Sequence, residues 1–193
     1  MTPAAMPTTQ SRPRRADALR NRERVLEAAA ELFAQKGLDA GIPEIAAVAG
    51  VGKATVYRSF PSKEHLVAAV ARLRLEWITE LVTHALTLDD PGRAFEDVIV
   101  TIAERQADDG AVAVSLAADI HLPELDATRA TMTATFETLI DRGRAAGALR
   151  ADATADDVRV LFSGVSQVLR AAGERDPAAW ARYGRLVADA LRA

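Results

Sequence analysis

The chain contains no cysteine among its 193 residues. This absence excludes disulfide bonds, thiolate nucleophiles and metal sites with cysteine ligands. No apolar run approaches the roughly 20 residues that a membrane-spanning helix requires, and residues 1–20 lack the apolar core of a signal peptide. We therefore expect a cytoplasmic protein that has no membrane partner and is stabilised by side-chain packing.

Patterns typical of enzymes are also missing from the sequence. It contains no Gly-rich phosphate loop, no G-x-S-x-G elbow and no HExxH segment. The acidic pairs at 89–90, 108–109 and 156–157 lie at expected turns or helix starts, where helix capping explains them. The three histidines do not have the spacing of metal ligands. We expect no enzymatic activity, no cofactor and no metal.

Charge is distributed unevenly along the chain. Residues 1–63 hold ten Lys and Arg against six Asp and Glu, a net charge of +4, whereas the remainder holds 14 against 21, a net charge of −7. A basic segment beside an acidic one suggests that a polyanion binds at the N-terminal end. Many unrelated proteins have a similar asymmetry, so charge alone does not decide the function.

The periodicity of apolar residues predicts an all-α fold. Ala, Leu, Arg and Glu are abundant after residue 17, and apolar residues recur every three or four positions with no strand-like alternation. Gly37 and Gly50 occupy expected helix ends or turns. Helices are expected over about 17–36, 42–49, 51–60, 63–88, 93–107, 111–119, 123–146, 154–173 and 177–192.

The stretch "IAAVAGVGKATVYRSF" at residues 45–60 has the spacing of a helix-turn-helix motif. Ala46 is small enough for a close helix crossing, Gly50 suits a turn with positive φ, and Val56 is expected to be buried. In such a motif, the second helix places its exposed side chains in the major groove of DNA. A surface helix with a solvated polar face remains the alternative for each of these residues taken alone.

Candidate DNA-binding residues lie on the outward face of this second helix and at the start of the next one. Lysine can bind a guanine edge or a phosphate, and Thr and Tyr hydroxyls can donate to phosphate. The N-terminal amides of the following helix offer a second phosphate site. The candidates are Lys53, Ala54, Thr55, Tyr57, Arg58 and Lys63.

Residues 20–67 resemble the N-terminal DNA-binding domain of the TetR family of bacterial transcriptional regulators. The similarity lies in "RVLEAAAELFAQKGLDA" and "IPEIAAVAGVGKATVYRSFPSKEHL". This resemblance implies a homodimer of about nine helices per subunit, which binds double-stranded operator DNA. It also implies release from the operator when a small-molecule effector binds the C-terminal domain, as in a ligand-responsive repressor.

The sequence departs from the family pattern at three places. Gly41, Ile42 and Pro43 stand where the family often has a helix-capping Thr, Gly52 replaces a frequent Ser, and Ser59 replaces an aromatic residue or His. We therefore expect no base contact from Ser59 and no phosphate contact from a capping side chain at the start of the second helix. Glu44 is the remaining candidate to cap that helix.

Three segments are expected along the chain. Residues 1–16 form a disordered basic arm, residues 17–62 the helix-turn-helix domain, and residues 63–193 the regulatory and dimerisation domain. Arg12, Arg14 and Arg15 precede the first expected helix, and Arg20, Arg22 and Arg24 begin it. The Arg-rich arm is expected either to enter a minor groove or to remain a solvated tail.

The last two helices carry broad apolar stripes that suit a four-helix dimer interface, although packing on their own subunit is the alternative. A twofold dimer would place two recognition helices about 34 to 36 Å apart and so read a palindrome. Gly164 and Gly184 suggest places of close helix approach. The predicted interface residues are Val158, Leu161, Val165, Leu169, Trp180, Tyr183, Val187 and Leu191.

Apolar faces in the C-terminal half, with a few polar residues among them, suggest a cavity for a small, largely apolar effector. Each residue can equally belong to the ordinary core. The predicted contacts are Trp77, Leu81, His84, Phe95, Ile99, His121, Phe136, Phe162 and Ser166. A helical protein-interaction module without DNA binding is the rival to a regulator, and selective binding to DNA distinguishes the two.

Overall fold

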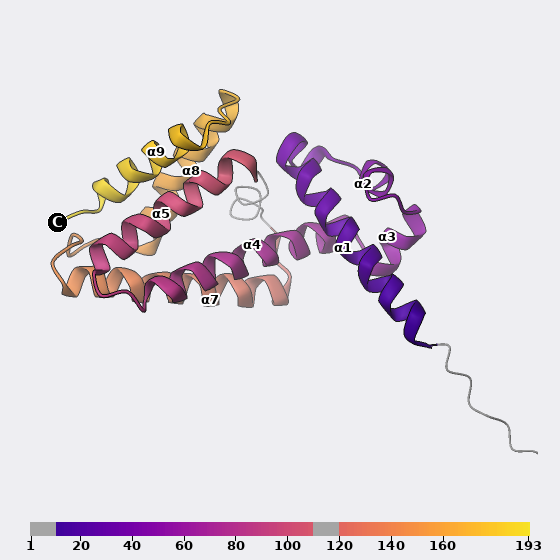
Figure 1. The fold of residues 1–193 in the computed structure, drawn as a ribbon, viewed down its shortest axis with the longest axis horizontal. Coiled ribbons are helices and arrows are strands. Elements are labelled where there is room, and N and C mark those ends of the chain that lie inside the picture. Colours follow the sequence, from indigo (N-terminus) through magenta and orange to yellow (C-terminus); the bar gives the residue numbers. More distant parts are fainter. Residues whose placement is uncertain (1–10, 110–119) are drawn as a thin grey trace, which may run out of the picture.

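The computed structural model describes residues 11–109 and 120–193. All regular elements in these ranges are helical, and the described C-terminal part adds a single isolated bridge between Leu149 and Arg192. The helices are α1 (Ser11–Lys36), α2 (Ile42–Val48), α3 (Lys53–Ser59), α4 (Lys63–Ala85), α5 (Pro91–Asp108), α7 (Pro123–Ala145), α8 (Ala155–Ala171) and α9 (Pro177–Ala190) (Figure 1). The predicted all-α fold is confirmed. The helix expected over 111–119 lies outside the described residues.

Helix α1 is longer than the sequence analysis predicted. It begins at Ser11, so residues 11–16, which were expected to be a disordered arm, are helical. Pro13 is tolerated there because the amides of the first helical turn have no intrahelical acceptor. The remaining residues of the expected arm, 1–10, lie outside the described part of the chain.

Helices α1, α2 and α3 enclose a small core of their own. Val25, Phe33, Ile45 and Val56 are each at most 1% exposed. The chain turns after α1 at Gly37 and between α2 and α3 at Gly50, with φ angles of 61° and 63°. Glycine adopts this left-handed conformation without the steric penalty of a Cβ atom. The predicted positive φ at Gly50 and burial of Val56 are confirmed.

Helix α4 belongs to two cores. Its first turns contribute Leu66, Val67 and Val70 to the core of α1 to α3, whereas Ile78 and Val82 belong to the large C-terminal core. Figure 1 shows α4 running from the α1–α3 unit into the C-terminal bundle, where α7 lies along it. Helix α4 therefore connects the N-terminal unit to the C-terminal bundle.

In the C-terminal bundle, α5 packs mainly against α9 (Figure 1). Gly184 of α9 makes this closeness possible, because a Cβ atom there would lie 2.8 Å from Ala103 Cβ and 3.2 Å from Val100 Cα. The prediction of close approach at Gly184 is confirmed. At Gly164 of α8 a Cβ atom would meet nothing within 4 Å, so the same prediction is wrong within the subunit.

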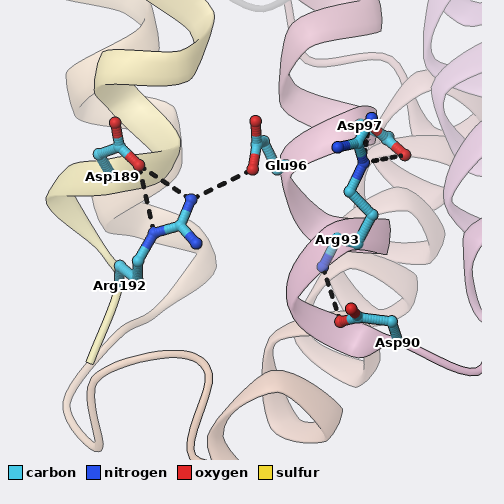
Figure 2. A network of polar contacts seen from close by, with 6 residues as sticks. All are labelled: Asp90, Arg93, Glu96, Asp97, Asp189 and Arg192. Carbon is cyan, nitrogen blue, oxygen red and sulfur yellow. Dashed lines mark hydrogen bonds and ion pairs between the residues drawn. The ribbon is translucent and has the colours of Figure 1, made fainter.

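Ionic contacts join the ends of α5 and α9 (Figure 2). Arg192 donates to Glu96 of α5 at 3.1 Å and to Asp189 at 2.9 Å, and Asp90 caps α5 by accepting from the amide of Arg93 at 3.0 Å. These contacts are exposed, so each contributes little to stability. Together with the Arg150 amide, which donates to the Leu191 carbonyl, they hold the C-terminus against the bundle.

Among the described helices, none is both long and apolar enough to span a bilayer.

Candidate nucleic-acid interface and ligand cavity

A short turn sets the angle between α2 and α3. The amide of Gly50 donates to the Ala47 carbonyl at 3.1 Å, and that of Val51 donates to the Ala46 carbonyl at 3.0 Å. Val56 then anchors the inner face of α3 and is fully buried. Because Val56 points inward, the residues on the other sides of this two-turn helix must face away from the core.

The outward face of α3 carries most of the predicted DNA-binding residues. Lys53, Ala54, Tyr57 and Arg58 are exposed, Tyr57 to 51%, and Thr55 is half-buried. No acidic residue lies on α3. This face therefore combines two cations with two hydroxyls around the small Ala54, a set that suits the phosphates and base edges of duplex DNA.

Arg22 of α1 fixes the other end of α3, a role that the sequence analysis did not foresee. Its guanidinium donates to the Ser59 carbonyl at 2.8 Å and lies 4.2 Å from the centre of the Phe60 ring. Arg20 pairs with Asp17, and Arg24 donates to Asn21. These three arginines lie on α1, as the sequence predicted, and each has a protein partner. No sequence motif signals the contact between Arg22 and Ser59, because it joins residues 37 positions apart.

The helix starts near this face differ in their capping. Gly41 caps α2 with no side-chain hydrogen bond, and Glu44 pairs with Lys36, so the suggested capping role of Glu44 is wrong. At α4, the Ser62 hydroxyl accepts from the His65 amide. The ammonium group of Lys63 donates to the carbonyl of Leu38, which ties α4 to the segment before α2.

Glu64 adds a negative charge to the first turn of α4. A hydrogen bond from the Ser62 side chain, followed by one from its own backbone amide, lowers the pKa of its carboxyl group. The carboxylate is thus held in its ionised form at the positive end of the helix dipole. Any phosphate at this helix start would have to approach beside that charge.

A cavity of about 240 Å³ lies among α4, α5, α7 and α8 of the C-terminal bundle. Its wall is mainly apolar, and its polar groups come from α7 and the start of α8. The lining residues are Ile78, Ile99, Ile102, Met132, Thr133, Phe136, Glu137, Ala155, Asp156, Val158, Arg159 and Phe162. Such a wall suits a small ligand that is apolar over most of its surface.

The charged groups of the cavity wall already have protein partners. Arg159 donates to Asp156 at 2.6 and 2.8 Å, and Glu137 accepts from the amide of Ala155 at 2.9 Å. The sequence analysis missed Glu137 and Arg159 because nothing in their spacing distinguishes them from ordinary surface charges on amphipathic helices.

The predicted ligand residues fall into different surroundings. Ile99, Phe136 and Phe162 line the cavity. Phe95 is buried in the core without lining it, Trp77 and Leu81 pack against that core at partial exposure, and Ser166 is buried one helical turn after Phe162. His84 and His121 are exposed at the end of α4 and before α7, so placing them in this cavity was wrong.

The predicted dimer residues also divide between two faces. Five are buried within their own subunit and cannot present side chains to a partner: Val158, Leu169, Trp180, Val187 and Leu191. For these five the predicted interface is wrong, because the apolar stripe seen in the sequence is the stripe that fills the subunit core. Leu161 is 39% exposed, and Val165 and Tyr183 are half-buried.

Exposed apolar side chains form a second, outward stripe on α8, and a further exposed apolar side chain lies on α9. Val160, Val168 and Leu186 are 55%, 67% and 49% exposed, and Gly164 lies between the first two on α8. Large exposed apolar side chains that gather on neighbouring helices are typical of interaction surfaces.

Within the described residues, no cluster of three or more His, Asp or Glu side chains is arranged to hold a metal.

Two parts of the sequence match known families of bacterial transcriptional regulators. Residues 25–70 match the bacterial regulatory proteins of the tetR family, and residues 90–193 match the C-terminal domain of SbtR-like transcriptional regulators. Among curated proteins, no significant match was found.

Solved structures extend the similarity over nearly the whole chain. A TetR transcription regulatory protein from Mycobacterium vanbaalenii is 33% identical, with 94% of this chain and 100% of that chain covered and a TM-score of 0.57. A TetR-family regulator from Agrobacterium tumefaciens shares the fold at 19% identity, with a TM-score of 0.73 over 91% and 100% of the two chains. A structure solved to explain the control of antibiotic production by bacterial hormones is 26% identical, with 91% and 99% covered and a TM-score of 0.67.

Proposed function

Because this chain belongs to the TetR family of bacterial transcriptional regulators, we propose that it is a ligand-responsive repressor. In this proposal it binds palindromic operator DNA as a homodimer, and a small, largely apolar effector releases it. The three segments expected from the sequence then act as a basic N-terminal region, a helix-turn-helix unit, and a regulatory and dimerisation unit. Helix α4 connects the last two.

The outward face of α3 is the observation that carries the proposal. Lys53, Tyr57 and Arg58 are exposed on a short helix that Val56 and Phe60 anchor from behind. In a helix-turn-helix protein, such a face enters the major groove and its side chains contact base edges and phosphates. The contact from Arg22 to the Ser59 carbonyl holds the helix rigidly, which reduces the entropy lost on binding.

The homodimer is supported by the outward apolar stripe of α8 and α9. Val160, Val168 and Leu186 would be covered by the same residues of a second subunit related by a twofold axis. Gly164 fits this arrangement, because an exposed glycine with no neighbour in its own subunit allows a partner helix to approach closely. Two subunits joined in this way present two α3 helices to one palindrome.

Release by an effector is supported by the position of the cavity. Ile78 of α4 lines the cavity, and Leu66 and Val67 of the same helix pack in the core that supports α3. A ligand that binds better to one position of α4 shifts the population toward that position and changes the spacing of the two α3 helices. A 26% identical structure concerns control by bacterial hormones, which supports regulation by a small molecule here as well.

Binding of the purified protein to the DNA upstream of its own gene tests the proposal. We expect a gel shift that is selective for one palindromic sequence and weakens as salt rises, because phosphate contacts displace counterions. An unrelated DNA fragment of equal length and base composition serves as the control. Equal affinity for both fragments, or no binding, would contradict the regulator and favour a protein-interaction module.

The coupling between cavity and DNA has its own test. A ligand found by thermal-shift screening should lower operator affinity, and operator DNA should lower ligand affinity by the same factor. An Ile78→Trp substitution, which fills the cavity from α4, should abolish ligand binding. A ligand that occupies the cavity and leaves operator affinity unchanged would contradict the coupling.

A further inference from the structure

Two buried polar residues and a partly buried arginine lie beyond one end of the apolar cavity. Gln106 of α5 follows the cavity residue Ile102 by four positions, and Ser166 of α8 follows Phe162 by four positions. Residues four apart lie on the same face of a helix, so both helices continue the cavity wall with a polar residue. Arg170 of α8 is one turn further on and donates to the carbonyl and the side-chain oxygen of Gln106, at 3.0 and 3.3 Å.

These groups have hydrogen-bonding capacity that the described residues do not use. Gln106 is 0% exposed and Ser166 is 4% exposed. The Nε2 atom of Gln106, the hydroxyl of Ser166 and the Nε atom of Arg170 are each sealed from solvent with no partner in the described part of the chain. A buried donor without an acceptor is unfavourable, and native proteins seldom leave several together.

The guanidinium of Arg170 gives the surroundings of Gln106 and Ser166 a positive charge. Among the described residues, no carboxylate lies within ion-pair distance of Arg170, whose guanidinium is held 5.3 Å from the centre of the Trp180 ring. The nearby carboxylate of Asp109 is shared by Arg74 at 2.7 Å and Arg105 at 3.6 Å. Burial, and then the charge of Arg175, lower the pKa of Arg170, and Asp109 opposes them.

All three unused groups can donate a hydrogen bond, and one belongs to a cation. Their natural complement is an anionic acceptor with two oxygens, which can accept from a guanidinium, an amide and a hydroxyl together. The adjoining cavity of about 240 Å³ is apolar and suits a short hydrocarbon chain or ring. Since the three atoms are sealed, an incoming head group has to part α5 and α8 to reach them.

We propose that the effector is an amphipathic carboxylic acid, with its apolar body in the cavity and its carboxylate bound by Gln106, Ser166 and Arg170. This inference rests on the proposed function, because it names the chemical class of the ligand that releases the repressor. It also assigns the movement of α8 against α5 as the first step that the ligand causes.

Calorimetric titration of the full chain with matched probes tests the proposal. Octanoate, octan-1-ol and octan-1-amine have the same chain and differ only in the head group. We expect octanoate to bind about tenfold or more tightly than either of the others, since hydrogen bonds to a charged group contribute more than neutral ones. Tightest binding of the amine, or no detectable binding of octanoate, would overturn the proposal.

Substitutions at the three groups separate ligand binding from a structural role. Ser166→Ala removes a hydroxyl that lacks a partner, and Gln106→Leu removes the unpartnered Nε2 atom together with the Oε1 atom that accepts from Arg170 at 3.3 Å. Because the backbone carbonyl of Gln106 still accepts from Arg170 at 3.0 Å in the leucine variant, both variants should fold with little loss of melting temperature. Each should lower octanoate affinity several-fold and leave octan-1-ol binding unchanged. Arg170→Met keeps the apolar stem and should cause the largest loss, with Arg185→Met on the exposed face of α9 as its control.

The two proposals fail in different ways. Gln106→Leu and Ser166→Ala variants that bind octanoate as tightly as the wild type would overturn the carboxylate site, even if the protein still selects its operator. Octanoate binding that requires all three groups, in a protein that shows no selective DNA binding, would instead support the site and reject the repressor. The gel shift and the titration therefore have to be made on the same preparation.

Discussion

Lys53 and Arg22 are both basic residues of the N-terminal unit, but their surroundings differ. Lys53 is exposed at the first turn of α3, and no hydrogen bond or ion pair with another described residue engages its ammonium group. Arg22 is held between the Ser59 carbonyl and the Phe60 ring. A cation already engaged by the protein is less available to a phosphate than one directed to solvent. At the scale of single residues, Arg22 therefore supports α3, and we propose that Lys53 is the one of the two that contacts DNA.

Replacement of Lys53 by alanine should weaken operator binding by about 1 to 3 kcal/mol if the ammonium group reads a base. The selectivity for operator over unrelated DNA should fall at the same time. Fluorescence anisotropy with labelled operator and unrelated duplexes, at two salt concentrations, measures both effects. An equal loss on both duplexes would assign Lys53 to phosphate contact only.

Lys36→Ala is a matched control for this experiment. It also removes one lysine from the N-terminal unit, but Lys36 pairs with Glu44 at the end of α1 and lies off α3. We expect its effect on operator affinity to be small. A loss as large as that of Lys53→Ala would indicate that net charge, and not the position on α3, determines binding.

At the scale of elements, the start of α8 is held by a capping box. The Asp157 carboxylate accepts from the Thr154 amide at 2.9 Å and from its hydroxyl at 2.8 Å, and the same hydroxyl accepts from the Asp157 amide at 3.2 Å. The hydrogen bond from the Thr154 side chain, followed by the one from its backbone, lowers the pKa of Asp157. Asp156 and Asp157 were predicted to act in capping, and this is confirmed for Asp157.

The capping box should make stability depend on acidic pH. Because the pKa of Asp157 is lower in the folded state than in the unfolded state, its contribution is fully present above the unfolded value of about 3.9 and is lost as pH falls through the folded value. Asp157→Asn should therefore flatten the fall of the melting temperature below about pH 4. Asp152→Asn, which removes a carboxylate outside the box, is the control, and equal slopes for wild type and Asp157→Asn would contradict the prediction.

The contact between α5 and α9 depends on the missing side chain of Gly184. Gly184→Ala places a methyl group against Ala103 Cβ and the Val100 backbone, and overpacking of this kind destabilises by about 1 to 3 kcal/mol. The gain in helix propensity, about 1 kcal/mol, offsets only part of this. Urea unfolding should show the loss.

A double substitution tests the cause of that loss. Ala103→Gly removes the nearer of the two contacting groups, so the Gly184→Ala/Ala103→Gly protein should be less destabilised than the sum of the single variants. Simple additivity would show that the contact with Ala103 is not the source of the effect.

At the scale of the whole molecule, α4 links the N-terminal unit to the C-terminal bundle, and the outward face of α8 and α9 is the proposed contact between subunits. Helix α4 passes through both cores, and the outward stripe of Val160, Val168 and Leu186 would join two subunits. The distance between the two α3 helices is then a property of the dimer and not of either subunit. DNA binding should consequently be lost when the dimer is lost.

Val168→Glu should convert the dimer to a monomer without unfolding the subunit. Val168 is 67% exposed, so a charged side chain is tolerated in the free subunit but not in an apolar interface. Sedimentation velocity measures the change, and operator binding should fall with it. Ala134→Glu on the exposed face of α7 is the control, and a Val168→Glu protein that remains dimeric would contradict this interface.

The helix-turn-helix could be predicted from local spacing because its features are local. Gly50 needs a positive φ, Val56 needs burial, and both requirements arise within one 16-residue stretch. The cavity could be predicted only in part. Ile99, Phe136 and Phe162 come from three helices, and their convergence with Glu137 and Arg159 depends on how those helices cross.

The sequence by itself determined the all-helical class, the order of the helices, and the position of the helix-turn-helix. These features follow from apolar periodicity and turn residues, which act over a few neighbouring positions. Only the tertiary structure decided which stripe of α8 faces the core, that Gly184 and not Gly164 serves a close contact within the subunit, and that Arg170 of α8 meets Gln106 of α5. Periodicity identifies the residues that share a face of a helix, but the packing of distant segments determines what covers that face.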